Sequence, residues 1–283
     1  MPGLFARRLV LRSVRRLYAW SRADPVEEEL RGWSWDRPPV KPRAYLGLGV
    51  SEVAGKYCPT RRDVWLRRKM GLAPETTEPL AKGRLVHEAV TAAVRCASRG
   101  LSRGWETWDI LTYCLGRFRP QGNGDTATAL KAYKSTLVTL LGEVEYERLV
   151  SGGSGLPVVS EMKVDGTPLG LSPQLSIDVY AENIVVDFKT GAPRDFHKLS
   201  IAGYALALEA EYEVPVDYGI LVYVNPSDSG LRVLYRPVYV SNELRRWFLE
   251  ERDEIVDMLV SNREPPKDKN CPQTCPFYRV CHQ

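Results

Sequence analysis

The sequence of 283 residues has no apolar run long enough to cross a bilayer. A membrane-spanning helix needs about 20 consecutive apolar residues, so we expect no membrane partner. The N-terminus also lacks the apolar core of a secretion signal, because arginines interrupt each of its apolar stretches. We therefore expect a cytoplasmic protein. The alternative for this arginine-rich, acid-free start is an organelle transit peptide.

Amide side chains are also scarce, with six asparagines and four glutamines. These thermolabile residues are depleted in proteins from hyperthermophiles, so the composition is typical of a source from a hot environment. Hydrophobic residues make up 44% of the chain and charged residues 26%. This is the balance of an ordinary globular protein with one large domain or two small ones.

Positive charge is concentrated in two segments, although the net charge is only +4. Residues 1–22 carry six arginines and no acid, and residues 56–69 carry six basic residues against Asp63 alone. Tyr57 and Trp65 lie within the second segment. Basic residues interleaved with aromatic residues suit the phosphates and bases of a nucleic acid. Solvated helix faces are the alternative interpretation.

Hydrophobic periodicity predicts the order of the elements. A period of 3.6 residues indicates helices, and a period of two indicates strands. The glycine-rich segment 151–157 separates the helical half from the half that contains the strands, and Ser241 is the expected N-cap of the last long helix. We expect helices at 4–20, 60–70, 79–99, 105–118, 125–149, 196–211 and 241–261. We expect strands at 158–164, 175–181, 184–189, 217–224 and 231–240.

This order predicts a mixed sheet. Three consecutive strands favour an antiparallel meander, and the helix at 196–211 allows the next strand to return in parallel. We therefore expect an α/β fold in which helices flank the sheet. The chain divides into four segments of one integrated unit. They are a basic helical extension at 1–55, a helical region at 56–150, the sheet core at 151–263 and a Cys-rich tail at 264–283.

Charged residues interrupt three expected strands at positions that can share a face. Residues i and i+2 of a strand point the same way, so Asp187 and Lys189 lie together and the apolar neighbours of Asp187 face a core. Asp178 and Glu161 occupy the two preceding strands. If the strands are neighbours, these four side chains converge on one face of the sheet.

A sheet face with these three carboxylates favours the binding of a cation. Carboxylates on a half-buried surface repel one another unless a cation neutralises them, and oxygen ligands suit Mg²⁺, Mn²⁺ or Ca²⁺. A lysine beside the ion can orient water and offset charge on a phosphate oxygen. The pattern therefore favours metal-assisted phosphodiester hydrolysis, with a solvent-facing strand and a surface ion pair as the alternative. His87, in GRLVHEAV, is either a further metal ligand or an ordinary helix histidine.

The tail CPQTCPFYRVCHQ contains Cys271, Cys275 and Cys281. Thiols this close usually bind metal where no secretion signal indicates a disulfide framework, and structural or disulfide cysteines are the alternative, since proteins of hyperthermophiles can contain disulfides. A fourth ligand is needed, for which Cys58 and His282 are the candidates. Four thiolates suit a [4Fe–4S] cluster or a structural zinc ion. Cys96 and Cys114 lie in helical patterns, where we expect buried core thiols.

Taken together, these residues resemble a known family. The segments GRLVHEAV, LSIDVY, VVDFKTG and HKLSIAGYALALE are similar in content and order to the motifs of RecB-like nucleases. That family is a branch of the restriction-endonuclease-like, or PD-(D/E)xK, fold. One upstream cysteine and three C-terminal cysteines look like the iron-sulfur nucleases of CRISPR adaptation. The basic N-terminal region resembles the larger archaeal subgroup of type I-A systems, and the motif resemblance covers roughly residues 55–283.

The resemblance implies a role for each matching residue. Lys189 would be the catalytic lysine, Tyr204 would lie near the DNA path, and Glu161 matches a less strict acidic position. The implied ligands of Mg²⁺ or Mn²⁺ are His87, Asp178, Asp187 and the backbone carbonyl of Phe188. The implied ligands of a [4Fe–4S] cluster are Cys58, Cys271, Cys275 and Cys281, so that the tail packs back on the Cys58 region. The expected DNA contacts are Arg61, Arg62, Arg67, Arg68 and Tyr204.

Two positions depart from the family pattern. Ser200 stands where the family usually has glutamine four residues before the tyrosine, and its shorter side chain can support the site only weakly or through water. Asp187 stands where many relatives carry glutamate, which is one methylene longer. Both carboxylates occur in related nucleases, so only Ser200 leaves a reduced or altered activity open.

The expected function is that of a metal-dependent deoxyribonuclease with an iron-sulfur cluster. It would act as a single-strand exonuclease that processes captured DNA for CRISPR spacer acquisition. The resemblance implies DNA, the CRISPR integrase and its small companion subunit as partners. The alternatives are a non-catalytic DNA-binding subunit of the adaptation complex, a zinc-bearing structural protein and a general DNA-repair nuclease.

Overall fold

The structure, a computed structural model, describes residues 7–121, 125–152, 158–227 and 230–282. The start of the helix expected at 4–20, and most of the segment expected to break the chain at 151–157, lie outside these residues. The helices are α1 (Arg7–Ala23), α2 (Val50–Ala54), α3 (Arg62–Met70), α4 (Glu78–Ser102), α5 (Thr107–Leu115), α6 (Thr126–Ser151), α7 (Lys198–Tyr212), α8 (Asn242–Val260) and α9 (Tyr278–His282). The strands are β1 (Val159–Val164), β2 (Leu175–Ala181), β3 (Ile184–Lys189), β4 (Tyr218–Ser227) and β5 (Gly230–Tyr239).

The helices and strands expected from the sequence are all present, with ends that differ by a few residues. The expected cap is confirmed, because the Ser241 side chain accepts a hydrogen bond from the backbone N–H of Leu244 at the start of α8. The short helices α2 and α9 are additional, since five residues are too few to show a periodic pattern.

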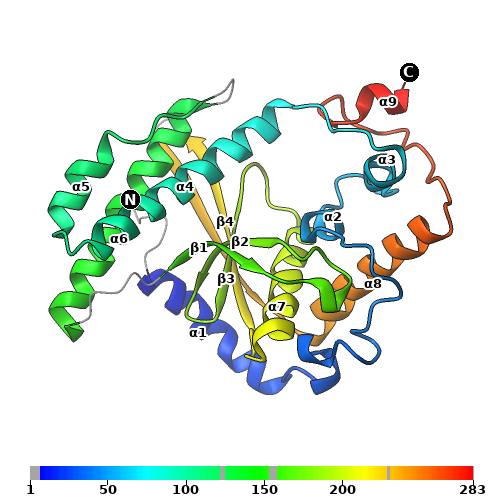
Figure 1. The fold of residues 1–283 in the computed structure, drawn as a ribbon, viewed down its shortest axis with the longest axis horizontal. Helices are drawn as coiled ribbons and strands as arrows, with labels where there is room; N and C mark the ends of the chain where they lie inside the picture. The colour runs from blue at the N-terminus through cyan, green and yellow to red at the C-terminus, as the bar shows by residue number, and fades with distance from the viewer. Residues whose placement is uncertain (1–6, 122–124, 153–157, 228–229, 283) are drawn as a thin grey trace.

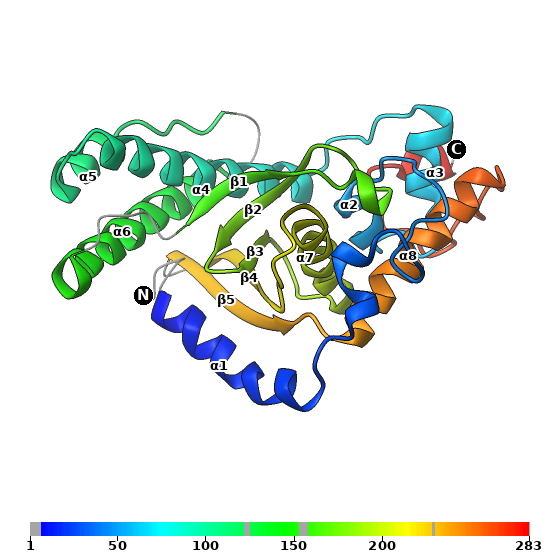
Figure 2. The ribbon, with the colours of Figure 1, turned by 60° about the horizontal axis from the view of Figure 1, so that its bottom comes forward.

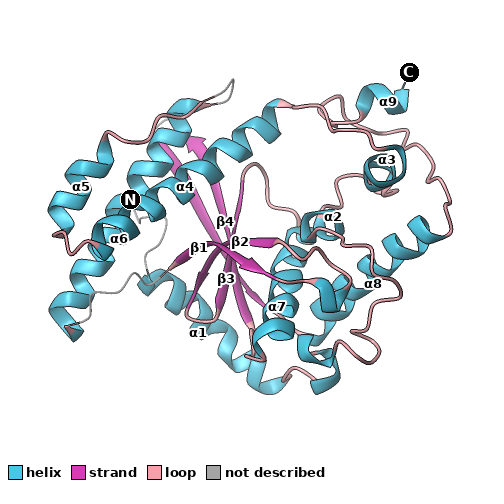
Figure 3. Ribbon diagram, viewed as in Figure 1, coloured by secondary structure: helices cyan, strands magenta, loops and turns pink. Residues whose placement is uncertain are grey.

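The five strands form one mixed sheet in the order β1-β2-β3-β4-β5. Adjacent strands are antiparallel except β3 and β4, which are parallel and joined through α7. The expected meander and parallel return are therefore confirmed. Figure 3 shows this sheet surrounded by helices, which is the expected α/β architecture.

Two hydrophobic cores lie on opposite faces of the sheet. On one face, α2, α3, α7 and α8 pack around residues such as Val185 and Leu221. On the other face, α4, α5 and α6 pack around Val186, Phe188 and Val222. Figure 1 shows these two groups of helices on opposite sides of the molecule. Successive residues of β3 therefore enter different cores, as a period of two requires.

The fit of α7 on the sheet depends on a glycine in β4. A Cβ atom added to Gly219 would lie 2.1 Å from a side-chain carbon of Ile201 on α7, which is far inside van der Waals contact. Only glycine allows this close approach. As a result α7 lies directly over the face of β3 that carries Asp187.

Figure 2 shows α1 lying alongside β5. A 2.6 Å hydrogen bond between the hydroxyls of Ser21 in α1 and Tyr218 in β4 joins this helix to the sheet. None of the helices in the described part of the chain combines the length and apolar character that a membrane crossing requires.

The C-terminal tail returns to the N-terminal half of the chain. In Figures 1 and 2, α9 lies beside α3. Arg62 donates a 2.6 Å hydrogen bond to the carbonyl of Pro265, and the backbone N–H of Glu75 donates one of 3.0 Å to the carbonyl of Pro276. Phe277 is buried in the same core as α3 and α8. These contacts hold the tail against the segment that begins with Cys58.

The expectation of free core thiols at Cys96 and Cys114 was wrong. The two residues form a disulfide that joins α4 to α5. Their separation of 18 residues conceals this proximity, because it arises only when α5 folds back on α4. A disulfide closing a loop of this length stabilises a fold by about 3 kcal/mol.

Candidate active site

The central strands bring the expected charged residues together. Asp187 and Lys189 point to the α7 side of β3, while Val186 and Phe188 enter the opposite core. The predicted division of faces is therefore confirmed. The face is not open, however, because α7 covers it and leaves Asp187 only 4% exposed.

Asp178 on β2 is held by two donors. Its Oδ1 lies 2.7 Å from Nε2 of His87 on α4, and its Oδ2 accepts a 2.9 Å hydrogen bond from the backbone N–H of Phe188. Burial works against its charge, but the hydrogen bond and charge of His87 outweigh burial and lower the pKa of Asp178. The same hydrogen bond raises the pKa of His87, with smaller contributions from the charges of Asp178, Glu161 and Asp187.

Asp187 is paired with the neighbouring lysine. Its Oδ2 lies 2.5 Å from Nζ of Lys189 and also contacts the hydroxyl of Ser200 on α7. Burial raises the pKa of Asp187 to about 6, opposed by Lys189 and reinforced by the charge of Asp178. Burial disfavours the charge of Lys189 as well, but the attraction of Asp187 and Asp178 prevails and raises its pKa. Two carboxylates thus act on one partly buried lysine.

Ser200 reaches this pair directly. Its hydroxyl contacts the Asp187 carboxylate and lies 2.7 Å from the carbonyl of His197. A hydroxyl has one hydrogen, so it donates to one of these oxygens at a time. The expected water-mediated support is therefore unnecessary for this contact, and whether serine lowers the activity stays a prediction.

Glu161 lies at the edge of the group. Its backbone has a positive φ of 50°, and it is missing from the otherwise regular register between β1 and β2. Its carboxylate pairs with Arg95 on α4, although its charge still contributes to the raised pKa of His87. A direct role for Glu161 in the site stays a prediction.

A cavity of about 160 Å³ opens beside Asp187 and Lys189. Tyr204, which was expected near the DNA path, lines it, and burial raises the pKa of its hydroxyl. Ser200, which stands at a motif position, and Tyr57, which was noted in the basic segment, also line the cavity. The remaining lining residues were not expected from the sequence: Ser51, Ala54, Gly55, Phe196 and His197.

A chain of hydrogen bonds borders this cavity. The Tyr57 hydroxyl lies 2.7 Å from Nε2 of His197, and the Tyr223 hydroxyl lies 2.9 Å from Nδ1 of the same ring. Burial lowers the pKa of His197 to about 4, and the charges of Lys189 and Arg194 add to this effect. The scarcity of histidine, with three in the chain, was the signal that could have singled out His197.

Two of the four expected DNA-binding arginines serve the fold instead. Arg61 is buried, donates a 2.8 Å hydrogen bond to the carbonyl of Val53 and pairs with Glu251. Arg62 is buried and bonds to the carbonyl of Pro265. Direct contact of Arg61 and Arg62 with DNA is therefore not supported. The other two are more exposed and pair with acids: Arg67 with Asp63 and Arg68 with Glu52.

The four expected cluster ligands are free thiols: Cys58, Cys271, Cys275 and Cys281. Cys58 follows α2, and Cys281 lies in α9. Burial, together with a hydrogen bond to Cys275 and the charges of Cys275, Cys58 and Cys281, raises the pKa of the Cys271 thiol to about 12. Cys271 and Cys275 contact each other, but among the described residues no three of these thiols are arranged to hold a metal ion. In number and type they fit a [4Fe–4S] cluster, in which each thiolate binds its own iron atom.

The donors around Asp187 fit a hard divalent ion by type, since they comprise two carboxylates, an imidazole and a backbone carbonyl. Across the described residues, however, no group of three or more His, Cys, Asp or Glu side chains is arranged to hold a metal ion. Nε2 of His87 is directed to Asp178, and Asp187 is directed to Lys189. An ion would have to replace at least one of these contacts.

The sequence of this chain is similar over most of its length to the sequences of known proteins. A family model described as CRISPR-associated exonuclease Csa1 matches residues 4–283. The CRISPR-associated exonuclease Csa1 of Thermoproteus tenax is 38% identical over 286 residues, which cover 96% of this chain and 97% of the relative. The protein of the same name from Saccharolobus solfataricus is 32% identical over 273 residues, covering 91% and 92%.

A solved structure described as "Crystal structure of SSO0001" covers 78% of this chain and 94% of its own, with 16% identity and a TM-score of 0.29. That similarity is too low to support a conclusion. The sequence matches, by contrast, place the chain in the class of CRISPR-associated RecB-like nucleases that its motifs resemble. Within that class, the chain belongs to the family of CRISPR-associated exonuclease Csa1.

Proposed function

We propose that this protein is a metal-dependent nuclease that shortens single-stranded ends of DNA captured for CRISPR spacer acquisition. The observation that carries the proposal is the buried group in which Asp178 and Asp187 share Lys189 beside a cavity. The exonuclease names of the two relatives support the same chemistry. The mixed sheet and its placement of these residues are compatible with a restriction-endonuclease-like fold.

The proposed ion is Mg²⁺ or Mn²⁺, held by His87, Asp178, Asp187 and the carbonyl of Phe188. When bound, it would supply Lewis-acid polarisation of the phosphodiester and a lowered pKa of the attacking water. Burial and the charge of Asp178 both raise the pKa of Asp187, and a bound cation would oppose both effects by stabilising the charged carboxylates.

Lys189 is the residue proposed to act on the reacting atoms. Its ammonium group is held 2.5 Å from Asp187 and its side chain is 25% exposed, so it is fixed on one side and accessible on the other. A cationic donor in this position can hold a water hydrogen-bonded and stabilise negative charge that develops on phosphate oxygens. Ser200 holds the Asp187 carboxylate from the side of α7.

The four thiols are proposed to bind a [4Fe–4S] cluster with a structural role. The contacts of Arg62 and Glu75 with the tail support this role, because the cluster would close the same junction. The proposed partners are DNA, the CRISPR integrase and its small companion subunit, and the proposed location is the cytoplasm.

The test is a cleavage assay on end-labelled single-stranded and duplex DNA, with Mn²⁺, Mg²⁺ or chelator. The compared proteins are the wild type, Asp187→Asn, which keeps the side-chain shape, and Asp257→Asn, which alters an exposed carboxylate on α8. We expect metal-dependent cleavage by the wild type and Asp257→Asn, and at least a 100-fold loss for Asp187→Asn, as for loss of a major electrostatic contribution. The position of the label gives the polarity.

Cleavage by Asp187→Asn at the wild-type rate would overturn the site. A wild-type protein that is loaded with iron and binds DNA, yet does not cut it, would instead indicate a non-catalytic DNA-binding subunit. Ser200→Gln, which restores the usual residue of the family, then tests whether serine is the reason for the missing activity.

A further inference from the structure

Tyr57 is an exposed aromatic residue at the edge of the candidate active site. The residue is 67% exposed, and it lines the same cavity as Asp187 and Lys189. Trp65, the other aromatic residue of the basic segment 56–69, is buried in a core. Tyr57 is therefore the aromatic residue of this segment that can contact a ligand.

The Tyr57 ring is fixed although it is exposed. It makes a T-shaped contact with Phe196 at 5.0 Å between ring centroids. Its hydroxyl lies 2.7 Å from His197, which is only 3% exposed and is held in turn by Tyr223. An aromatic side chain that is already immobilised loses little conformational entropy when a ligand stacks on it.

Positive charge accompanies the ring. Lys189 lines the same cavity as Tyr57, and the charges of Lys189 and Arg194 act on the Tyr57 hydroxyl together with the negative charge of Asp187. Arg194 is exposed, in the loop between β3 and α7. An exposed, fixed aromatic ring with cations beside it is the combination that binds single-stranded nucleic acid, where bases stack and phosphates pair with the cations.

We propose that Tyr57 is a specificity-determining residue that stacks on the base of the nucleotide beside the scissile phosphodiester. His197 acts as a positioning residue, because it fixes the ring through the hydroxyl. A base inside a duplex is covered by its neighbours, so this contact selects an unpaired end over a paired one. This inference rests on the proposed nuclease function and adds the substrate feature that the site recognises.

The test combines three protein variants with a modified substrate. Tyr57→Leu removes the ring, Tyr57→Trp keeps a stacking surface, and Tyr45→Leu is the matched control at another tyrosine, 58% exposed, that does not line the cavity. A set of single-stranded oligonucleotides carries one abasic site at each position near the cut. Binding is measured by fluorescence anisotropy in chelator, and KM and kcat are measured with metal.

We expect Tyr57→Leu to weaken binding and raise KM about tenfold on intact DNA, as one lost stacking contact does. Tyr45→Leu should remain near the wild type, whereas Tyr57→Trp, which keeps a stacking surface but loses the hydroxyl contact with His197, should weaken binding less than Tyr57→Leu. One abasic position should weaken wild-type binding by a similar factor and have no further effect on Tyr57→Leu, since both changes remove the same contact. Tyr57→Leu should also lose preference for unpaired over paired ends.

Equal effects of the abasic sites on the wild type and on Tyr57→Leu would overturn the inference, because a merely structural role of Tyr57 predicts that result. If Tyr57→Leu does not fold, the abasic series on the wild type and Tyr57→Trp decides in its place. Cleavage by the wild type with no response to the abasic series contradicts stacking and leaves the nuclease function intact. Binding that responds to the abasic series without any cleavage contradicts the nuclease function and leaves stacking supported.

Discussion

Burial disfavours the charged form of the Asp187 side chain. At 4% exposure a carboxylate loses nearly all of its hydration, and the pKa of Asp187 rises to about 6 although Lys189 is in contact. One lysine cannot fully compensate two carboxylates, because Asp178 lies close enough to add to the repulsion. The negative charge of the two carboxylates is therefore not fully compensated, and a divalent ion bound here would compensate it.

His197 gives a prediction for the pH dependence of stability. Its pKa falls from 6.5 in a free chain to about 4 in the fold, so the unfolded state binds the proton more readily. Its contribution to stability is complete above pH 6.5, falls as the pH drops, and is lost once the pH passes below 4. We expect the contribution of His197 to the free energy of unfolding of the wild type to fall by about 3 kcal/mol between pH 7 and pH 4, because each unit of the pKa difference corresponds to about 1.4 kcal/mol.

The measurement is urea unfolding of the metal-free wild type and of His197→Gln across this range. The difference in unfolding free energy between the two proteins should change in favour of His197→Gln as the pH falls. A difference that stays constant with pH would show that His197 titrates normally in the folded protein.

Some residues of the site could be predicted from the sequence and others could not. Asp187 and Lys189 could be assigned to one face because the geometry of a strand fixes the direction of each side chain. Tyr57 and His197 lie 140 residues apart, and the helical period that predicted 196–211 gives no indication of what His197 contacts. Their contact depends on how the turn after α2 packs against the start of α7, which no local rule gives.

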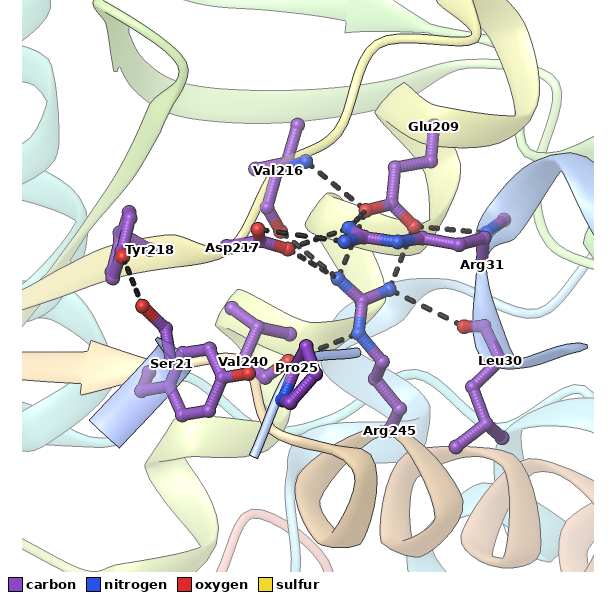
Figure 4. A network of polar contacts seen from close by, with 12 residues as sticks. Ser21, Pro25, Leu30, Arg31, Glu209, Val216, Asp217, Tyr218, Val240 and Arg245 are labelled. Atoms are coloured by element: carbon purple, nitrogen blue, oxygen red, sulfur yellow. Dashed lines mark hydrogen bonds and ion pairs between the residues drawn. The ribbon is translucent and has the colours of Figure 1, made fainter. Parts of the chain in front are cut away.

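At the scale of elements, a buried charge network joins α7, α8 and the chain that follows α1. Figure 4 shows Glu209 at its centre. Its two oxygens accept hydrogen bonds from Arg31 and Arg245 and from the backbone N–H groups of Gly32 and Val216. Burial works against the charge of Glu209, but Arg245 and the other donors outweigh burial and lower its pKa. The network therefore holds α7 in place over the sheet.

Removing the central charge should be strongly destabilising. Glu209→Gln leaves Arg245, which is completely buried, with only the more distant carboxylate of Asp217, at 3.6 Å, as an ionic partner. We expect a loss of about 3 kcal/mol in the free energy of unfolding, because the buried charge of Arg245 is then only partly compensated. Urea or thermal unfolding measures it. Glu250→Gln, at an exposed position of α8, is the control and should change stability by less than about 0.5 kcal/mol; equal effects of the two variants would contradict a central role for the network.

At the scale of the whole molecule, the junction between the tail and the Cys58 segment closes the chain on itself. Phe277 and Cys281 are buried in the core that contains residues of α3 and α8, and the four free thiols belong to the two segments that meet at this junction. The turn that contains Cys58 also contains Tyr57, which borders the active-site cavity. A cluster at this junction would thus stabilise the position of the turn as well as that of the tail.

Loss of one thiol should therefore reduce both metal content and stability. We expect Cys275→Ala to lose most of its iron and to unfold at a lower temperature than the wild type, because metal-binding energy contributes to folding. Iron, sulfide and zinc analysis together with thermal unfolding are the measurements. Cys96→Ser, which removes a disulfide cysteine instead, should keep its iron. Full iron content in Cys275→Ala, or zinc in place of iron in the wild type, would contradict the proposed cluster.

The sequence by itself determined the local structure and the identity of the chemical groups. The periods of its apolar residues set the strands and long helices, and the spacing of two between Asp187 and Lys189 set their common face. The type and order of the motif residues were sufficient to indicate the family, which the comparisons confirmed. These properties could be predicted because each depends on residues a few positions apart.

Only the tertiary structure decided which side chains are available. It buried Arg61 and Arg62 against internal partners, joined Cys96 to Cys114 and covered Asp187 with α7. It also left the Tyr57 ring exposed and fixed its hydroxyl on His197. The reason is physical: burial, ion pairing and cavity shape depend on which surfaces meet when distant segments pack, and local sequence patterns do not specify those meetings.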